Sequence, residues 1–258
     1  MNPEESSSAS PKLSAEQRLA LAALTKVKLY KYDDTAPCLE LGHEGILMAM
    51  SVFVEDLDHI SGDLDLDAAT RSKSRRCHTI AGQMKSRINS IGEYPAEERR
   101  YFAYALDDKP VGLLMAKSVD GRDDELEIEF VISNPGIRGA ASALIEEALS
   151  QCGDDPKLSL TSIHGALGAY RRLGFFPRDT EVFSGDELKR HDDIFLKMSL
   201  AEASNLDRNM KQLYNSYRKM VLRPGESVAW EKSGGVWKFL PDGKKYLVEN
   251  TPVETAQD

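Results

Sequence analysis

The residues best suited to chemistry begin with a run of small side chains, "NPGIRGAASALIEEAL", at 134–149. The run follows the strand-like segment "ELEIEFVIS" and opens a segment whose apolar spacing predicts a helix. The first N–H groups of a helix have no partner within it, and the helix dipole adds partial positive charge there. Gly136, Gly139, Ala140 and Ala141 would let a phosphate reach those amides, so the run predicts a pyrophosphate site. Close packing of the helix on a sheet is the alternative explanation.

A second segment, "SIHGALGAYRRLGFF" at 162–176, follows a further strand-like run. Together the two segments resemble the GNAT acetyltransferase superfamily. In that family a strand, a pyrophosphate loop and a helix precede another strand and a helix that ends in a Tyr-x-x-x-Gly-Phe signature. The signature here runs from Tyr170 to Phe175. The resemblance covers roughly residues 100–199, and more weakly the chain from Lys26.

The family's pyrophosphate loop reads Gln or Arg, two residues, Gly, one residue, then Gly or Ala. Gly139 and Ala141 match its last two fixed positions, which puts Gly136 on the first and departs from the pattern there. A rival register starts at Arg138 and puts Ala141 where the middle glycine belongs. The resemblance implies cofactor contacts from Gly136, Ile137, Arg138, Gly139, Ala140 and Ala141, and from the backbone N–H groups of Val131 and Ser133.

The resemblance implies direct transfer of an acetyl group from acetyl-coenzyme A to an amine, through a tetrahedral intermediate and without a covalent enzyme intermediate. Such chemistry needs a base for the amine, donors for the developing oxyanion and an acid for the departing thiolate. Tyr170 matches the family position of that acid, and a phenol with a pKa near 10 is a sensible donor to a thiolate. A ring that only packs beneath the cofactor is the alternative for Tyr170.

Three further side chains are candidates for the proton path. Glu127 and Glu129 share a face of the strand before the loop, where the family often carries its base, and either could act directly or through water. A solvated strand face is the alternative explanation for both carboxylates. His164 stands where the family commonly has an Asn at the end of a strand, which implies a place near the thiol end of the cofactor. A helix-capping or packing role is the alternative for His164.

Periodicity predicts the elements that position these residues. Leu126, Ile128, Phe130 and Ile132 alternate and predict one buried face for the strand that carries the two glutamates. The predicted elements are a capped helix from Ser14, a strand at 26–32, helices near 44–60 and 68–92, three meander strands within 100–133, a helix to Ser150, a strand at 157–163, a short helix at 166–173, strands near 180–183 and 193–200, a helix from Leu206 to Val221, and three short strands within 226–250.

These elements predict an α/β fold of the α+β type, with a GNAT-like, mostly antiparallel central sheet flanked by helices. We divide the chain into a disordered amino terminus (1–13), an acetyltransferase domain (14–200) and a carboxyl-terminal helix and β-meander extension (201–258). The extension could cover a sheet edge, form a homodimer contact or recognise a protein substrate.

Composition excludes several classes of function. The net charge of −9 argues against binding to nucleic acid or to an anionic membrane. No apolar run is long enough to span a membrane. The 3 cysteines form no paired motif, which is typical of reduced cytoplasmic thiols and suggests neither disulfides nor a zinc site. The segment "DLDLDAATRSKS" lacks the EF-hand glycine and glutamate, so we expect no metal.

The acceptor is suggested by charge. The acidic stretch "EDLDHISGDLDLD" lies between the first two helices of the predicted domain, and in the family this connection borders the acceptor site. It would therefore attract a cationic amine such as a protein lysine or N-terminus, a polyamine or an aminosugar. A solubilising loop is the alternative. The basic stretch 71–87 could meet the cofactor's 3′-phosphate, an acidic partner or the acidic stretch, or form a solvated helix face.

Two other functions fit the same sequence. A degenerate GNAT fold could bind an acyl-coenzyme A as a sensor or serve as an interaction scaffold, which the departure at Gly136 favours. The retained Tyr170 disfavours it. A bacterial effector is the other alternative, in which the serine-rich amino terminus would be an export address.

Overall fold

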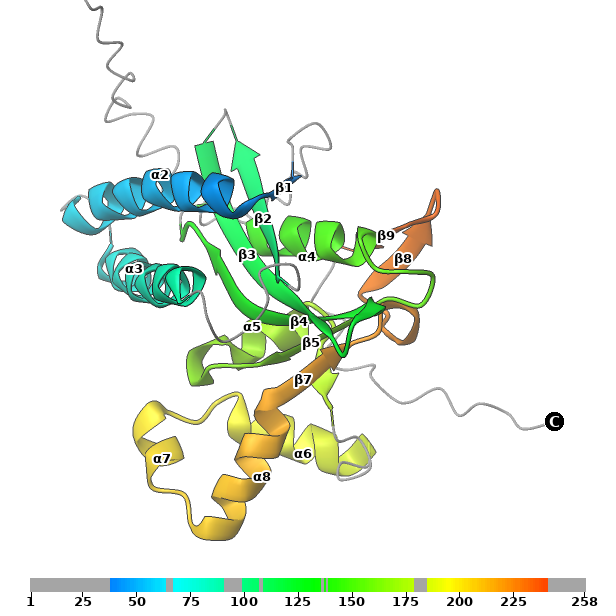
Figure 1. Ribbon diagram of the computed structural model, residues 1–258. Helices are drawn as coiled ribbons and strands as arrows, with labels where there is room; N and C mark the ends of the chain where they lie inside the picture. Colours follow the sequence, from blue (N-terminus) through cyan, green and yellow to red (C-terminus); the bar gives the residue numbers. More distant parts are fainter. Residues whose placement is uncertain are drawn as a thin grey trace, which may run out of the picture.

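The computed structural model describes residues 38–63, 67–90, 99–106, 109–135, 137, 139–178 and 185–240. Within these residues a seven-stranded sheet has the order β1-β2-β3-β4-β5-β7-β6 (Figure 1). The strands are β1 (Cys38–Leu41), β2 (Arg99–Leu106), β3 (Lys109–Val119), β4 (Arg122–Ser133), β5 (Lys157–Thr161), β6 (Phe176–Pro177) and β7 (Lys219–Leu222). Neighbouring strands are antiparallel except β4 and β5, which run parallel. The mixed, mainly antiparallel sheet with flanking helices confirms the predicted fold class.

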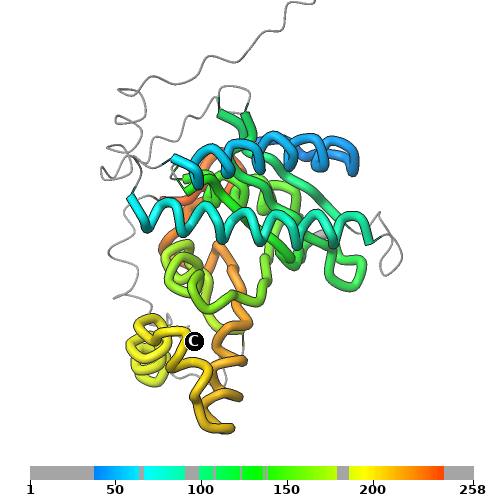
Figure 2. Tube along the Cα trace, turned by 90° about the vertical axis from the view of Figure 1, so that its left-hand side faces the viewer, coloured from blue at the N-terminus to red at the C-terminus, as the bar shows by residue number. Residues whose placement is uncertain are grey.

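Helices cover both faces of the sheet, as Figures 1 and 2 show. α2 (His43–Gly62) and α3 (Ala68–Asn89) pack together on one face, and α4 (Ala140–Ser150) packs on the other. The short α5 (Leu167–Arg172) follows β5. These four helices are confirmed where the apolar spacing predicts them.

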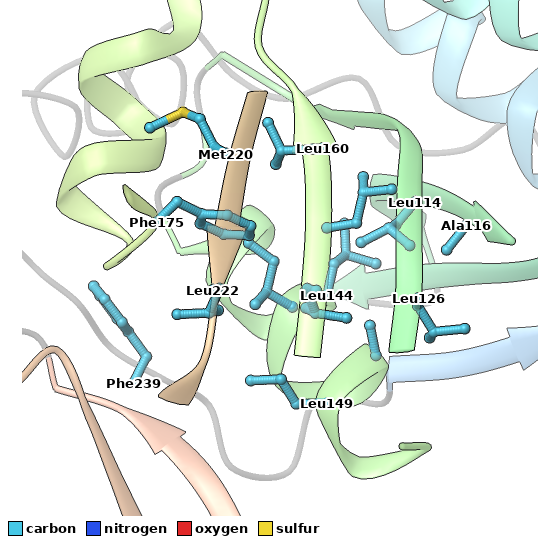
Figure 3. Packing of buried hydrophobic residues seen from close by; sticks show 14 of the residues in the cluster. Leu114, Ala116, Leu126, Leu144, Leu149, Leu160, Phe175, Met220, Leu222 and Phe239 are labelled. Carbon is cyan, nitrogen blue, oxygen red and sulfur yellow. The ribbon is translucent and has the colours of Figure 1, made fainter. Parts of the chain in front are cut away.

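The core lies on both sides of β3, because successive side chains of a strand point to opposite faces. Leu113 and Met115 are fully buried against α2 and α3. Leu114 and Ala116 are fully buried in the larger cluster around α4, part of which Figure 3 shows. The sheet is therefore a central layer between two apolar layers, and the candidate site must lie at its edges or ends.

A β-bulge in β4 changes the face that its side chains occupy. The pairing register with β3 shifts at Glu129, which is left as an extra residue on β4. Leu126 and Ile128 pack in the α4 cluster, whereas Phe130 and Ile132 pack with α2 and α3. The prediction that these four residues share one face is therefore wrong, because a bulge leaves a continuous alternation in the sequence unchanged.

Three helices are inserted between β6 and β7, and they gather at the lower end of Figure 1. They are α6 (Gly185–Phe195), α7 (Leu200–Ser204) and α8 (Arg208–Arg218). The chain then returns to the sheet as β7, which pairs with β5 on one side and with β6 on the other. The sheet thus continues past residue 200, so the predicted boundary between the domain and its extension falls inside a helical insertion.

Two predicted elements in this region are wrong. Residues 193–200 are not a strand but the end of α6, a turn and the start of α7, where Ser199 and Glu202 form a capping box. The helix predicted to reach Val221 ends at Arg218, because pairing with β5 takes the next residues into the sheet. Contacts between distant segments override the local apolar pattern in both places.

After β7 the chain forms a hairpin of β8 (Trp230–Ser233) and β9 (Val236–Phe239). The Trp230 indole N–H donates to the Leu173 carbonyl oxygen at 2.8 Å, and the Phe239 amide donates to the Glu146 carboxylate at 2.8 Å. These bonds fix the hairpin against α4 and the end of α5. The described residues do not include the third strand of the predicted meander, residues 1–13, the helix from Ser14, the strand at 26–32 or the strand near 180–183.

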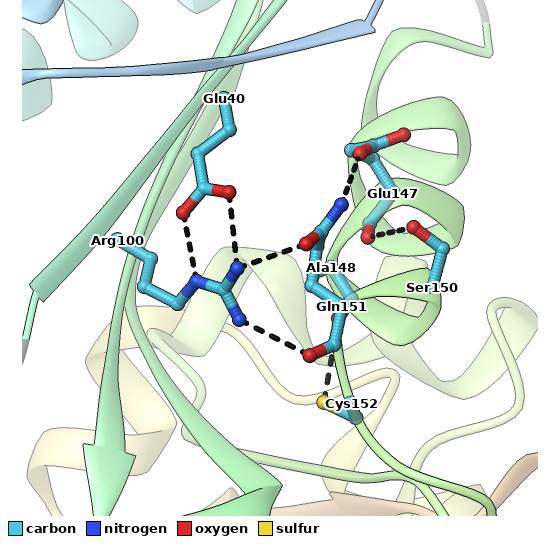
Figure 4. Close-up of polar contacts among 7 residues, drawn as sticks. All are labelled: Glu40, Arg100, Glu147, Ala148, Ser150, Gln151 and Cys152. Atoms are coloured by element: carbon cyan, nitrogen blue, oxygen red, sulfur yellow. Dashed lines mark hydrogen bonds and ion pairs between the residues drawn. The ribbon is translucent and has the colours of Figure 1, made fainter.

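Arg100 on β2 joins the edge of the sheet to the end of α4 (Figure 4). Its Nε and Nη2 atoms donate to the two Glu40 carboxylate oxygens at 2.8 and 3.0 Å. Its Nη1 and Nη2 atoms also donate to the backbone and side-chain oxygens of Gln151 at 3.1 and 2.9 Å. Bidentate, charge-assisted bonds of this kind are geometrically specific. They hold α4 in place, and the other end of this helix belongs to the candidate site.

A buried ion pair joins α5 to the insertion. Arg171 donates from Nε and Nη2 to the Asp192 carboxylate at 3.1 and 2.8 Å, and from Nη1 to the Phe175 carbonyl oxygen at 2.8 Å. The Tyr217 hydroxyl donates to the same carboxylate. The Arg171 side chain is 2% exposed, so its charge depends on this single partner.

We therefore expect Asp192→Ala to lower the free energy of unfolding by about 3–5 kcal/mol, the usual cost of leaving a buried charge unpaired. Asp193→Ala is the matched control, because Asp193 is exposed and pairs only with the exposed Lys197. Urea unfolding of both variants measures the difference. Equal midpoints for the two variants would show that the insertion is not held through Asp192.

Candidate active site

Beyond Ile128, β4 has one edge that β5 does not cover. β5 pairs with β4 only from Glu125 to Ile128. It ends at Thr161, and the next residue turns to α8, where the Ser162 amide donates to the Arg218 carbonyl oxygen at 2.8 Å. In the described part of the chain no strand follows β4 further on that side. We call residues 129–133 on this side the open edge of β4.

Two backbone N–H groups point toward the open edge. The Asn134 amide donates to the Val111 carbonyl oxygen of β3 at 2.8 Å, so it faces the opposite side. Because N–H groups alternate in direction along a strand, those of Ser133 and Val131 face away from β3. These are the two amides for which the sequence predicts cofactor contacts. Their direction suits an extended amide-containing chain lying along β4.

The predicted pyrophosphate loop begins with a turn in which the Ile137 amide donates to the Asn134 carbonyl oxygen at 3.0 Å. It ends at Gly139, the N-cap of α4, whose φ of 89° and ψ of −17° lie in the left-handed region. No side chain caps this helix start. Its first amides are therefore available to an anion, as the sequence predicts. Gly136 and Arg138 lie outside the described residues.

The small residues of this run are small for different reasons. Ala140 is fully buried, and a Cβ on Gly112 of β3 would lie 3.2 Å from the Ala140 Cβ, so close packing of helix on sheet explains this alanine. Gly139 has open space around it and is explained by its positive φ. Ala141 is only half-buried. Gly139 and Ala141 therefore leave an open surface at the start of α4.

Tyr170 lies on α5, just after the end of β5. Its ring packs edge-on against Phe175, with 5.6 Å between ring centroids. Burial raises the pKa of the Tyr170 hydroxyl above its ordinary value, so the group is protonated at neutral pH. The side chain also packs against the apolar cluster around α4. Tyr170 therefore carries a proton with which it can donate a hydrogen bond to a ligand.

The signature glycine after Tyr170 serves the fold. Gly174 has a φ of 84°, and a Cβ at this position would collide with the Ser227 Oγ atom. The Phe175 amide donates to the Tyr170 carbonyl oxygen at 3.0 Å and closes the end of α5. The Tyr-x-x-x-Gly-Phe pattern thus fixes the helix that carries the tyrosine.

The two carboxylates of β4 lie on the face that α3 covers, and both have cationic partners. Glu129 is 12% exposed, with its oxygens 3.5 Å from Arg87 Nη2 and 3.9 Å from Arg99 Nε. Glu127 is 42% exposed and lies 3.2 Å from Lys117 Nζ. Because the bulge adds one residue after Ile128, Glu127 and Glu129 remain on the same face, as predicted.

His164 begins the short 3₁₀ turn that follows β5. Its Nδ1 atom lies 2.5 Å from the Tyr214 hydroxyl oxygen on α8. The Arg218 guanidinium lies 5.7 Å from the centre of the Tyr214 ring. Tyr214 is a residue that sequence reasoning missed, because its place in a helical apolar stripe indicated only a packing role.

α3 connects the two sides of the candidate site. The Cys77 thiol donates to the Ser133 carbonyl oxygen at the end of the open edge, over 3.5 Å. The adjacent Arg76 places Nη1 3.6 Å from the position that a Cβ on Gly165 would occupy, beside His164. Two consecutive residues of α3 therefore lie close to the end of β4 and to the turn after β5.

The acidic stretch is not the loop that the sequence predicts, because α2 continues to Gly62 and carries most of it. Several of its carboxylates have structural partners. Asp56 accepts a hydrogen bond from the Asn134 side chain, Asp58 lies 3.4 Å from His78 Nε2, and Asp67 caps α3. Glu55 on the same helix is exposed.

The described residues lack two kinds of feature. None of their helices has the length and apolar character that a membrane span needs. No three His, Cys, Asp or Glu side chains gather there in a way that could hold a metal ion.

Several solved structures are similar to this chain. Escherichia coli ElaA has 16% sequence identity and a TM-score of 0.37, with 56% of this chain and 89% of that chain covered. The PaiA N-acetyltransferase of Thermoplasma acidophilum, in complex with coenzyme A, has 14% identity and a TM-score of 0.34, with 57% and 92% covered. N-acetylglutamate synthase of Neisseria gonorrhoeae has 13% identity and a TM-score of 0.32, with 73% and 35% covered.

No curated protein matches the sequence. The family model described as acetyltransferase (GNAT) family matches residues 68–175. This range begins at α3 and ends with the Phe175 of the tyrosine signature, so it includes the open edge of β4, the start of α4 and α5. The chain therefore contains a domain of the GNAT acetyltransferase family at residues 68–175.

Proposed function

We propose that the protein is an N-acetyltransferase that moves an acetyl group from acetyl-coenzyme A to an amine by direct attack. One observation carries the proposal: the open edge of β4 leads straight into an uncapped helix start, and the proton-donating Tyr170 follows the neighbouring strand. An anion site, an extended hydrogen-bonding edge and an acid are the three features that a coenzyme A thioester requires.

The residues present fit acetyl-coenzyme A. The Val131 and Ser133 amides face the open edge and would bind the pantetheine arm and the thioester. The first amides of α4 would bind the pyrophosphate, and Gly139 leaves room for it to approach. The cofactor contacts assigned above to residues 136–141 remain part of this proposal.

Tyr170 is the proposed acid for the leaving thiolate. Its raised pKa keeps the phenol protonated at neutral pH, and the same apolar surroundings would raise the basicity of a thiolate that forms beside it. Glu127 and Glu129 are the proposed bases for the incoming amine, directly or through water. Glu127 is the more accessible of the two, since its side chain is 42% exposed. His164 is the remaining member of the proposed catalytic set, and its ring contacts Tyr214 of α8.

The proposed acceptor is a cationic amine such as a lysine side chain, an N-terminus, a polyamine or an aminosugar. The last turns of α2 carry Glu55, Asp56 and Asp58, and Asp56 is bonded to Asn134 at the start of the loop. Negative charge beside the site would raise the local concentration of a cation and favour it over neutral amines.

Turnover is tested by following release of free coenzyme A while acetyl-coenzyme A is mixed with lysine peptides, polyamines and aminosugars. The proposal predicts amine-dependent release with one of these cations and none with acetylated versions of the same compounds. Binding of acetyl-coenzyme A without turnover across the panel would favour an acyl-coenzyme A sensor instead.

The alkylation rates of the three cysteines test where the cofactor binds. Burial raises the pKa of the Cys38 thiol to about 12 and that of Cys152 to about 11, and it also raises the pKa of Cys77. We expect acetyl-coenzyme A to slow alkylation of Cys77 several-fold, because this thiol contacts the end of the open edge. Cys38 and Cys152 are internal controls with unchanged rates. Mass spectrometry of the alkylated peptides measures all three, and equal slowing of the three would contradict this placement.

A further inference from the structure

The helical insertion reaches the candidate site through one side chain. The Tyr214 hydroxyl on α8 lies 2.5 Å from His164 Nδ1. The two ring nitrogens of an imidazole point in roughly opposite directions, so Nε2 points away from α8. His164 is followed by Gly165, which lies beside Arg76 of α3, and the next residue of α3 contacts Ser133 of the open edge. His164 therefore stands between the insertion and the open edge.

The position of Tyr214 is fixed by bonds from the next turn of α8. The Ser162 amide donates to the Arg218 carbonyl oxygen at 2.8 Å, and Arg218 Nε donates to the Ser162 carbonyl oxygen at 2.6 Å. The preceding residue, Tyr217, donates to Asp192, which is paired with Arg171. α8 is thus held both to the end of β5 and to α5, and its tyrosine cannot move independently of the strand that carries His164.

The chemistry of the two groups decides which one donates. Burial raises the pKa of the Tyr214 hydroxyl, so the phenol keeps its proton at neutral pH and is a good donor to an imidazole lone pair. When Nδ1 accepts, the neutral imidazole carries its own proton on Nε2. That N–H is a hydrogen-bond donor that points away from the Tyr214 hydroxyl.

We propose that Tyr214 is a positioning residue of the insertion that holds His164 as a neutral Nε2–H donor to the thioester carbonyl oxygen. This inference rests on the proposed acetyltransferase function and gives His164 a role distinct from that of a base. Glu127 and Glu129 remain the proton acceptors, and the insertion becomes part of the active site rather than an appendage.

The step balances as follows. A β4 carboxylate first takes one proton from the ammonium, directly or through water, and the neutral amine nitrogen then forms a bond to the acetyl carbonyl carbon. The second proton that this nitrogen loses restores the one that Tyr170 gives up below. Negative charge develops on the carbonyl oxygen, which accepts the hydrogen bond from His164 Nε2. The carbon–sulfur bond then breaks, the carbonyl reforms, and the thiolate takes the proton of Tyr170. His164 ends the cycle with the same proton that it had at the start.

Two substitutions of His164 separate a donor from a base. A glutamine at this position has an N–H donor but cannot accept a proton, whereas alanine has neither property. The proposal predicts that His164→Ala lowers kcat about 100-fold, the scale of a lost oxyanion donor. It predicts that His164→Gln stays within about tenfold of wild type. A loss in His164→Gln as large as that in His164→Ala would overturn the donor role.

Tyr214→Phe tests the positioning role. We expect kcat to fall about five- to tenfold with the KM for acetyl-coenzyme A unchanged, and we expect no further fall when the change is added to His164→Ala. Tyr101→Phe is the control, because this buried tyrosine of β2 packs with α2 and α3 and makes none of the contacts that hold α8. An equal fall from Tyr214→Phe with and without His164 would contradict the proposal.

An NMR measurement that needs no turnover tests the same role of Tyr214 and His164 if no acceptor is found. Long-range ¹H–¹⁵N spectra of the imidazoles show which nitrogen carries the proton, and His164→Ala identifies the relevant signals among the 5 histidines. The proposal predicts an Nε2–H imidazole with a hydrogen-bonded Nδ1 in the wild type, and loss of that bond in Tyr214→Phe. An Nδ1–H imidazole in the wild type would overturn it. Failure of turnover alone would instead contradict the acetyltransferase function.

Discussion

Replacing Tyr170 with phenylalanine is expected to lower kcat at least about tenfold while leaving the dissociation constant of acetyl-coenzyme A unchanged. The phenol is the proposed acid for the thiolate, and the change removes one oxygen atom without removing the ring. The ring's edge-on contact with Phe175 is kept, so α5 should remain in place. Loss confined to kcat is the signature of a group that acts in the transition state.

Tyr101→Phe is the matched control for this experiment. Tyr101 is a buried tyrosine on β2 that packs with α2 and α3 and has no role in the proton path proposed here. It should keep kcat close to the wild-type value. Steady-state kinetics with saturating amine, together with calorimetric binding of acetyl-coenzyme A, measures both quantities. Wild-type kcat in Tyr170→Phe would remove this residue from the mechanism and leave only its packing role.

Replacing Gly139 with glutamate is expected to weaken acetyl-coenzyme A binding at least about 100-fold. Gly139 caps α4 with a φ of 89°, and nothing lies within 4 Å of the position of an added Cβ. A carboxylate there would stand where the pyrophosphate should bind, and repulsion of a few kcal/mol is reasonable for charges at such a distance near a protein surface. A factor of 100 corresponds to about 2.7 kcal/mol.

Two control variants separate charge from shape. Gly139→Ala adds only the strain of a left-handed backbone, about 1–2 kcal/mol in the free energy of unfolding. Gly139→Gln adds the same strain and the bulk of glutamate without its charge. We expect the dissociation constant to increase in the order Ala, Gln, Glu. Equal binding by the Gln and Glu variants would show that no anionic group of the ligand lies at the start of α4.

The sequence predicts the site best where the signal is local. Alternating strands, the helix after the small-residue run and the Tyr-x-x-x-Gly-Phe pattern are properties of neighbouring residues, and they lead to the observed sheet, α4 and α5. The reason why each residue of this run is small could be assigned only from the structure. The packing of Ala140 near Gly112 identifies an alanine that serves the fold, whereas Gly139 has open space around it and is the glycine of the proposed anion site.

What the sequence does not predict depends on contacts between distant residues. His164 and Tyr214 are 50 residues apart, and Cys77 and Ser133 are 56 apart. No local periodicity records such pairs. The bulge at Glu129 leaves the alternation of apolar residues in the sequence unchanged. The residues of β7 continue the apolar spacing of α8, although they pair with β5 as a strand. In the sequence the insertion therefore looks like the start of an extension, although β7, a strand of the central sheet, follows it.

The central claim is that this chain binds acetyl-coenzyme A at the open edge of β4 and the start of α4. The most direct measurement is a calorimetric titration of the purified protein with acetyl-coenzyme A. The account predicts one site per chain with a dissociation constant on the order of 1–100 μM. No binding at millimolar acetyl-coenzyme A would contradict it and would leave the small-residue turn as a packing device alone.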